Sequence, residues 1–95
     1  MKSPRMCYHA MERFREHHPE ATRDEAQSYF KYGEEISPKA MRVMYFRGTG
    51  DSTYILSPDR KGVFVLDNWA GVIITYLRLS ALIQGWCRNQ WPMAA

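Results

Sequence analysis

The sequence predicts an α+β fold in which two N-terminal helices pack on a four-stranded antiparallel meander sheet. Three observations favour this fold. Apolar residues recur at helical spacing before residue 33, short apolar runs follow at intervals of roughly ten residues after residue 40, and turn residues separate these runs. A chain of 95 residues can bury one modest core, so we expect a single domain over residues 1–95.

The two predicted helices cover residues 6–18 and 23–32. The first helix has one apolar stripe, and Pro19 follows its last turn. The residues of this stripe are Met6, Cys7, Ala10, Met11 and Phe14. Thr22 and Glu25 have the spacing of a capping box, which predicts the start of the second helix.

Four predicted strands follow the helices. They cover residues 41–47, 52–57, 63–66 and 72–79. Turns rich in glycine, proline and aspartate separate them, and short turns of this kind are typical of an antiparallel meander. The segment 34–39 is predicted to be a connector. The tail, residues 80–95, fits either a helical turn or an extension of the last strand.

The positive charge lies in the strand-rich half of the chain. Residues 41–95 hold six basic and three acidic side chains, whereas residues 1–40 hold seven of each, and the net charge is +3. A basic sheet suits an anionic partner, so we expect RNA, DNA or an acidic host protein surface. Chance scatter of charges is the alternative explanation.

The cysteines indicate a reducing compartment. Cys7 and Cys87 lie at opposite ends of the chain and have no metal-ligand spacing. Together with the six methionines, this predicts a cytoplasmic protein without a metal or a cofactor. The N-terminus has no apolar run typical of a signal peptide, and no segment approaches the ~18 apolar residues of a membrane span, so we expect no membrane contact.

His9 and Arg13 are candidate functional residues on the first helix. They lie four residues apart and share a face. Histidine is the usual general acid or base near neutral pH, and arginine can contact nucleic acid. The alternative is a solvated histidine beside a solvated arginine. His17 and His18 are interpreted as helix-end or surface residues, because adjacent histidines on a helix point about 100° apart and rarely share a metal.

The last predicted strand carries three further candidates. Strict alternation predicts that Thr75 shares a face with Ile73 and Leu77, whereas Tyr76 and Arg78 lie on the other face, at a rim open to water. A tyrosine beside an arginine on such a rim can stack a base and hold a phosphate. A cross-strand tyrosine and a surface arginine are the alternative.

The remaining candidates lie in turns and in the tail. Arg47 lies among hydroxyl side chains at the first predicted hairpin, and this combination is typical of phosphate binding, with ordinary turn polarity as the alternative. Arg60 and Lys61, in the next turn, are candidates for nucleic-acid binding. Trp86 and Trp91 are candidates for partner binding, with a packed tail as the alternative.

Three short motifs together resemble a known superfamily. They are Tyr-His-Ala-Met-Glu-Arg-Phe at residues 8–14, the basic Arg47, and Val-Ile-Ile-Thr-Tyr at residues 72–76. With the order helix, helix and meander, they are similar to the small nucleases that group barnase-like, EndoU-like, colicin-type and RelE-like toxins. The resemblance covers most of residues 8–79.

This resemblance implies metal-independent RNA cleavage, in which the ribose 2′-OH attacks the adjacent phosphate. It implies that His9 is the general acid or base and that Arg47 and Arg78 stabilise the charge that develops on the phosphate. It also implies that Thr75 and Tyr76 position the phosphate or donate a proton.

Two functions from different classes therefore stay open. One is a small RNase or toxin-like nuclease. The other is a non-enzymatic phage or mobile-element protein that inhibits a host protein complex, which the aromatic content of 14% favours, and a nuclease fold reused for binding lies between them. The feature that separates them is whether His9 converges with Arg47, Thr75, Tyr76 or Arg78 in one cleft.

Overall fold

The computed structural model describes residues 4–45, 51–80 and 83–84. The strands in these residues are β1 (Arg5–Met6), β2 (Glu34–Ile36), β3 (Ser52–Leu56), β4 (Gly62–Asp67) and β5 (Val72–Arg78). The helices are α1 (Tyr8–Arg15), α2 (Arg23–Lys31) and α3 (Pro38–Tyr45). The strands form one mixed sheet in the order β1-β5-β4-β3-β2, in which only β1 and β5 run parallel. The predicted α+β class is confirmed.

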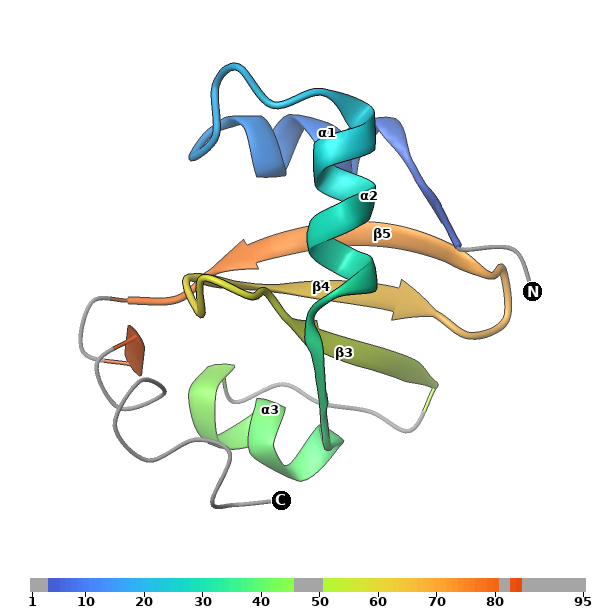
Figure 1. Cartoon of the computed structure of the whole chain (residues 1–95). Helices are drawn as coiled ribbons and strands as arrows, with labels where there is room; N and C mark the ends of the chain where they lie inside the picture. Colours follow the sequence, from blue (N-terminus) through green and yellow to red (C-terminus); the bar gives the residue numbers. More distant parts are fainter. Residues whose placement is uncertain (1–3, 46–50, 81–82, 85–95) are drawn as a thin grey trace.

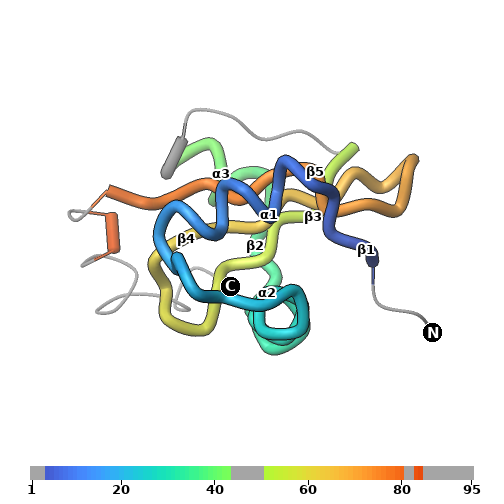
Figure 2. The backbone as a smooth tube through the Cα atoms, turned by 90° about the horizontal axis from the view of Figure 1, so that it is seen from above, coloured from blue at the N-terminus to red at the C-terminus, as the bar shows by residue number. Residues whose placement is uncertain are grey.

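The sheet is covered on both faces. Helices α1 and α2 lie over one face and α3 lies under the other (Figure 1). Seen from above, α1 runs over the sheet while α2 is viewed end-on (Figure 2). The core on the α1 and α2 side comprises Met6, Ala10, Met11, Phe14, Ala21, Ala26, Phe64, Ile73 and Tyr76. The core on the α3 side comprises Ile36, Met41, Tyr54, Leu56, Val63, Val65 and Leu79.

Both predicted N-terminal helices form. The capping box operates at α2, where the Thr22 hydroxyl accepts the backbone N–H of Glu25 at 3.1 Å. Helix α1 is shorter than predicted, because Arg5 and Met6 are extended and pair with β5. The buried residues of α1 belong to the predicted apolar stripe.

The prediction of a strand over residues 41–47 was wrong, because residues 38–45 form α3. The Ser37 hydroxyl accepts the N–H of Ala40 at 3.1 Å, and Pro38 occupies the first helical position. These are helix-start signals in a segment predicted to be a connector. Met41 then packs against the sheet with an exposed fraction of 1%.

Within the described residues the sheet has five strands and is mixed, so the predicted four-stranded meander was also wrong. Strand β1 has two residues and runs parallel to β5, and β2 has three residues and pairs antiparallel with β3. The central part, β3-β4-β5, is the antiparallel meander that the turn residues predicted.

A β-bulge in β5 changes which side chains share a face. Thr75 pairs with Val65, but the next pair is Leu66 with Ile73, so Ile74 is an extra residue. Ile73 and Tyr76 therefore both join the core on the α1 and α2 side, although they are three residues apart. The prediction that Ile73 and Thr75 share a face was wrong for this reason.

Candidate functional site: a basic groove between α1 and β5

A groove of about 580 Å³ lies between α1 and the outer edge of β5. One wall consists of α1 and the residues just after it, and the other consists of five consecutive residues of β5. The lining residues are His9, Arg13, Glu16, His17, Ile74, Thr75, Tyr76, Leu77 and Arg78. Four of these carry an imidazole or a guanidinium, so the groove is rich in groups that bind anions.

The amphipathic pattern of α1 builds the helical wall. Ala10, Met11 and Phe14 face the core, so His9 and Arg13, one turn apart, are left on an exposed face that borders β5. Arg13 donates to the Glu16 carboxylate at 3.2 Å, and both side chains are about half exposed. This ion pair holds the single carboxylate of the groove beside one of its two guanidinium groups.

The strand wall is a sheet edge. Strand β1 pairs only with Val72 and Ile73. Cys7, just after β1, donates its N–H to the Ile73 carbonyl at 3.0 Å and its Sγ–H to the Ile74 carbonyl at 3.5 Å. The chain then turns into α1. From Ile74 onwards, no strand in the described part of the chain pairs with β5 on this side.

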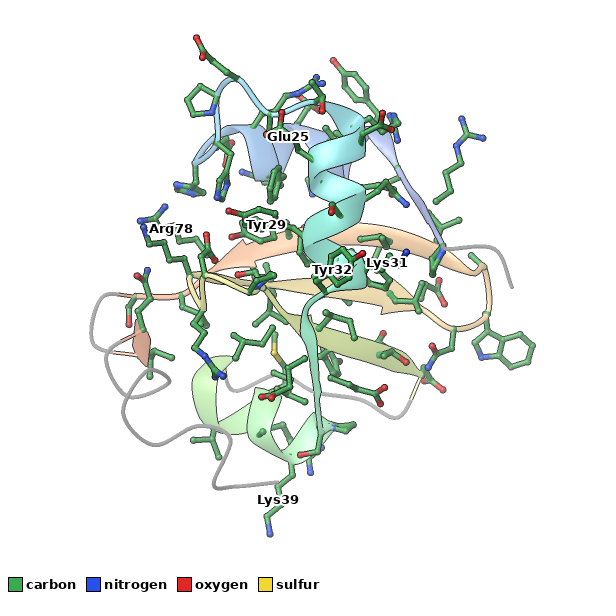
Figure 3. All side chains as sticks on the ribbon, in the orientation of Figure 1. Glu25, Tyr29, Lys31, Tyr32, Lys39 and Arg78 are labelled. Atoms are coloured by element: carbon green, nitrogen blue, oxygen red, sulfur yellow. The ribbon has the colours of Figure 1, made fainter. Side chains whose placement is uncertain are left out.

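The bulge places Arg78 on the side of α1. Tyr76 lies in the core beneath α1, and Arg78, two residues further along the strand, leaves β5 on the same face. Figure 3 shows Arg78 on the side of the sheet that carries Tyr29 and away from Lys39.

His17 and Arg78 are close enough to interact electrostatically. The pKa of His17 lies below its ordinary value of 6.5, because of partial burial and the positive charge of Arg78, with a smaller effect of His18. Glu16 opposes this shift but does not cancel it. His17 is therefore biased toward its neutral form, which can accept a proton.

The side chains of Tyr76 and Thr75 do not lie where the sequence predicted them, at an open rim and on the face of Ile73. Tyr76 as a whole residue is 2% exposed, and its ring packs against Phe14 and Phe64, with ring centroids 5.1 and 4.9 Å away. Burial raises the pKa of its phenol far above the ordinary value. Tyr76 is thus not at an open rim, unlike Arg78. Thr75 pairs with Val65 and leaves the strand on the α3 side.

The structure brings together five of the candidates from the sequence: His9, Arg13, Thr75, Tyr76 and Arg78. Arg60 and Lys61 lie in the turn between β3 and β4 and do not line the groove. Arg47, Trp86 and Trp91 lie outside the described residues.

His17 is the groove residue that sequence reasoning missed. It was interpreted together with His18 as a helix-end residue. The available signal was its spacing, because His17 lies one further turn along the face that His9 and Arg13 define.

His18, in contrast, has a structural role. Its ring stacks on Phe14 with centroids 4.2 Å apart, and its Nε2 lies 3.3 Å from the Asp59 carboxylate. Asp59 also accepts the Ser57 hydroxyl and the N–H of Lys61. His18 therefore ties the end of α1 to the turn between β3 and β4, next to the groove.

Among the described residues, no three or more acidic, histidine or cysteine side chains are grouped as a metal site would require. No described helix is long and apolar enough to cross a membrane. Comparison of the chain with protein-family models, curated proteins and solved structures gave no match.

Proposed function

We propose that this protein is a small ribonuclease that cleaves RNA in the groove between α1 and β5 without a metal ion. The observation that carries the proposal is the convergence of His9 with Arg78 in one groove. His17 and Arg13 strengthen it. Two imidazoles and two guanidinium groups can supply an acid, a base and charge stabilisation from the chain itself.

The reaction needs two proton transfers and one displacement at phosphorus. One imidazole accepts the proton of the ribose 2′-OH as that oxygen attacks the adjacent phosphate. The bond from phosphorus to the 5′ oxygen breaks, and the second imidazole, in its protonated form, donates a proton to that leaving oxygen. The products are a 2′,3′-cyclic phosphate and a free 5′-OH.

The surroundings of His17 suit the base. Its pKa lies below the ordinary value because of partial burial and Arg78, so at neutral pH it is largely unprotonated. His9, on the first turn of α1, then acts as the acid. Arg13 and Arg78 hold the phosphate and stabilise the charge on its oxygens in the transition state.

The test is cleavage of a mixed oligoribonucleotide in EDTA, with detection of the cyclic phosphate. We expect His9→Ala and His17→Ala each to lower the cleavage rate by about 10²- to 10⁴-fold, as is usual for a lost general acid or base. Glu12→Ala is the matched control, because Glu12 is exposed on α1 and does not line the groove. A 2′-O-methyl oligonucleotide should not be cleaved.

Three results would contradict the proposal. The first is the absence of cleavage by the wild-type protein at micromolar concentration. The second is equal cleavage by the wild type and both histidine variants, which would indicate a contaminating enzyme. The third is cleavage of the 2′-O-methyl oligonucleotide, which excludes attack by the 2′-OH.

A further inference from the structure

We propose that a pocket beside the first turn of α1 binds the RNA nucleotide on the 3′ side of the cleaved bond. This inference rests on the proposed ribonuclease function, because the roles of His9 and His17 in the proposed reaction set the direction of the RNA chain. Binding to the pocket can be measured without cleavage, so the two proposals can fail separately.

The pocket has a volume of about 500 Å³ and lies where β1 leads into α1, close to the start of α2 (Figure 1). Its lining residues are Arg5, Met6, Cys7, Tyr8, Arg23 and Val72. Two of these six residues carry a guanidinium and none is acidic, and the first turn of α1 also has no acidic side chain. The pocket therefore offers positive charge with no carboxylate in its walls, which suits a phosphate.

One of the two guanidinium groups is held in place by the backbone. Arg23 donates to the Met6 carbonyl at 2.6 Å. Gln27, one turn further along α2, donates its side-chain amide to the Pro4 carbonyl at 2.9 Å. Within the described part of the chain, neither Arg5 nor Arg23 forms an ion pair with a carboxylate. A guanidinium has five N–H donors, so one bond to a carbonyl leaves others for phosphate oxygens.

Tyr8 adds an aromatic ring that the fold leaves open. It is 75% exposed, and no other described ring packs against it. The core face of α1 is formed by other residues, so this ring is available to stack a base. An aromatic ring for the base beside arginines for the phosphate is the combination by which many proteins bind single-stranded RNA.

The lining residues of the pocket continue those of the groove. In α1, Tyr8 lines the pocket and the next residue, His9, lines the groove. In β5, Val72 lines the pocket and Ile74 lines the groove, two residues further along. A nucleotide chain that lies in the groove can therefore extend into the pocket.

The proposed reaction determines which nucleotide enters the pocket. His17 takes the proton of the attacking 2′-OH, and His9 donates a proton to the 5′ oxygen of the leaving nucleotide. The leaving nucleotide, on the 3′ side of the cleaved bond, thus lies at the His9 end of the groove. We infer that Tyr8 stacks the base of this nucleotide and that Arg5 and Arg23 hold the phosphate that follows it.

The experiment measures binding of dinucleotides that have a 3′-phosphate and a 2′-O-methyl group in place of the attacking 2′-OH. Fluorescent 2-aminopurine replaces either the first or the second base, and stacking on a ring quenches its fluorescence. We expect quenching at the second position only. Tyr8→Leu should abolish this quenching and weaken binding by about five- to hundredfold. Tyr32→Leu is the control, because Tyr32 is also exposed and lies at the other end of α2.

The phosphate gives the second readout. Removal of the 3′-phosphate should weaken binding to the wild type by about fivefold or more. The double variant Arg5→Gln with Arg23→Gln should bind the two dinucleotides alike. Arg5→Gln alone keeps the contact of Arg23 with Met6 and should show an intermediate difference. Lys39→Gln, on the α3 side, is the control and should retain the full difference.

Three results would overturn the inference. Quenching of the first base instead of the second would mean that the chain runs in the opposite direction. Equal quenching in the wild type and Tyr8→Leu, or an effect of the 3′-phosphate that the double variant retains, would mean that the pocket is not the site. RNA cleavage without quenching of the second base would overturn this inference and leave the proposed function intact. Quenching of the second base without RNA cleavage would overturn the proposed function alone.

Discussion

At the scale of single residues, the chemistry of the groove depends on the influence of Arg78 on His17. In the wild type, the positive charge of Arg78 disfavours the imidazolium form of His17. Removal of this guanidinium in Arg78→Gln should therefore raise the pKa of His17. The shift can be measured from the His17 ring proton by NMR. The acid limb of the proposed RNA cleavage should move to higher pH in parallel, since His17 would be protonated over a wider range. Lys39→Gln is the control and should leave the pKa of His17 unchanged. A pKa of His17 that is equally unchanged in Arg78→Gln would contradict the electrostatic effect of Arg78 on His17.

Asp59 is the second residue with an altered acidity. Burial acts to raise the pKa of Asp59, but hydrogen bonds from Ser57, the Lys61 N–H and His18 outweigh it, so its pKa lies below 3.8. A carboxyl group whose pKa is lower in the folded state stabilises the fold above its unfolded pKa, and this stabilisation is lost as the pH falls through the folded value.

We therefore expect Asp59→Asn to lower the free energy of unfolding by about 1–2 kcal/mol at pH 7, as the loss of these charge-assisted hydrogen bonds implies. The difference from the wild type should shrink as the pH falls below about 3.8. Urea unfolding at several pH values measures both effects. Asp51→Asn, in an exposed turn, is the control. A difference that does not change with pH would exclude the proposed role of the charge.

Gly62 is restricted by the buried ring of Tyr76. A Cβ at position 62 would lie 2.2 Å from the ring carbon that carries the hydroxyl and from the hydroxyl oxygen itself. The phenol has no hydrogen-bond partner in the described residues, although Ser57 lies near it. We expect Gly62→Ala to destabilise the protein by about 1–3 kcal/mol through overpacking. Adding Tyr76→Phe should recover part of this loss, and thermal unfolding of the single and double variants tests it.

At the scale of elements, α2 depends on its cap. The Thr22 hydroxyl accepts the N–H of Glu25, so Thr22→Ala should cost about 1 kcal/mol. Thr22→Ser retains the acceptor and should cost much less. Denaturant unfolding separates the two variants. An equal loss in both would show that the methyl group, rather than the cap, is important.

The elements that could be predicted are those whose signals are local. A capping box and an apolar stripe predicted α2 and α1, and turn residues separated β3, β4 and β5. Strands β1 and β2 could not be predicted, because two or three residues are too short to show a period of two. Residues 41–45 contain so many apolar side chains that they fit a strand as well as a helix. The Ser37-Pro38 start signal was the only local feature that distinguished them.

At the scale of the whole molecule, the groove concentrates cations, so RNA affinity should depend on salt. For a single strand, each phosphate contact contributes a slope of about −0.7 in a plot of log K against log salt. The double variant Arg13→Gln with Arg78→Gln removes two expected phosphate contacts. We expect it to reduce the magnitude of this slope by about 1.4 for a 2′-O-methyl oligonucleotide. Lys39→Gln should leave it unchanged. Identical slopes for the wild type and the double variant would place the phosphate contacts elsewhere.

The candidate site was only partly predictable, because it depends on contacts between distant segments. His9 and Arg78 could each be selected by residue type, but their convergence depends on how α1 crosses β5. The environment of Tyr76 depends on the bulge at Ile74, which no local signal indicates. His17 was missed because its adjacent His18 suggested one shared role, whereas the two rings lie in different surroundings.

The single extra residue Ile74 reverses which side chains of the following part of β5 face α1. Before it, the core on the α1 side takes Ile73, and after it the same core takes Tyr76 instead of Thr75. Deletion of Ile74 would leave Thr75 and Leu77 on the α3 side and Tyr76 and Arg78 on the α1 side. A regular strand that kept Ile74 without the bulge would instead turn Thr75 and Leu77 toward α1 and Tyr76 and Arg78 toward α3. A strand otherwise unchanged in composition would then bury the wrong half of its residues and lose a cation of the groove. One residue position thus determines how the sequence of β5 is divided between core and surface.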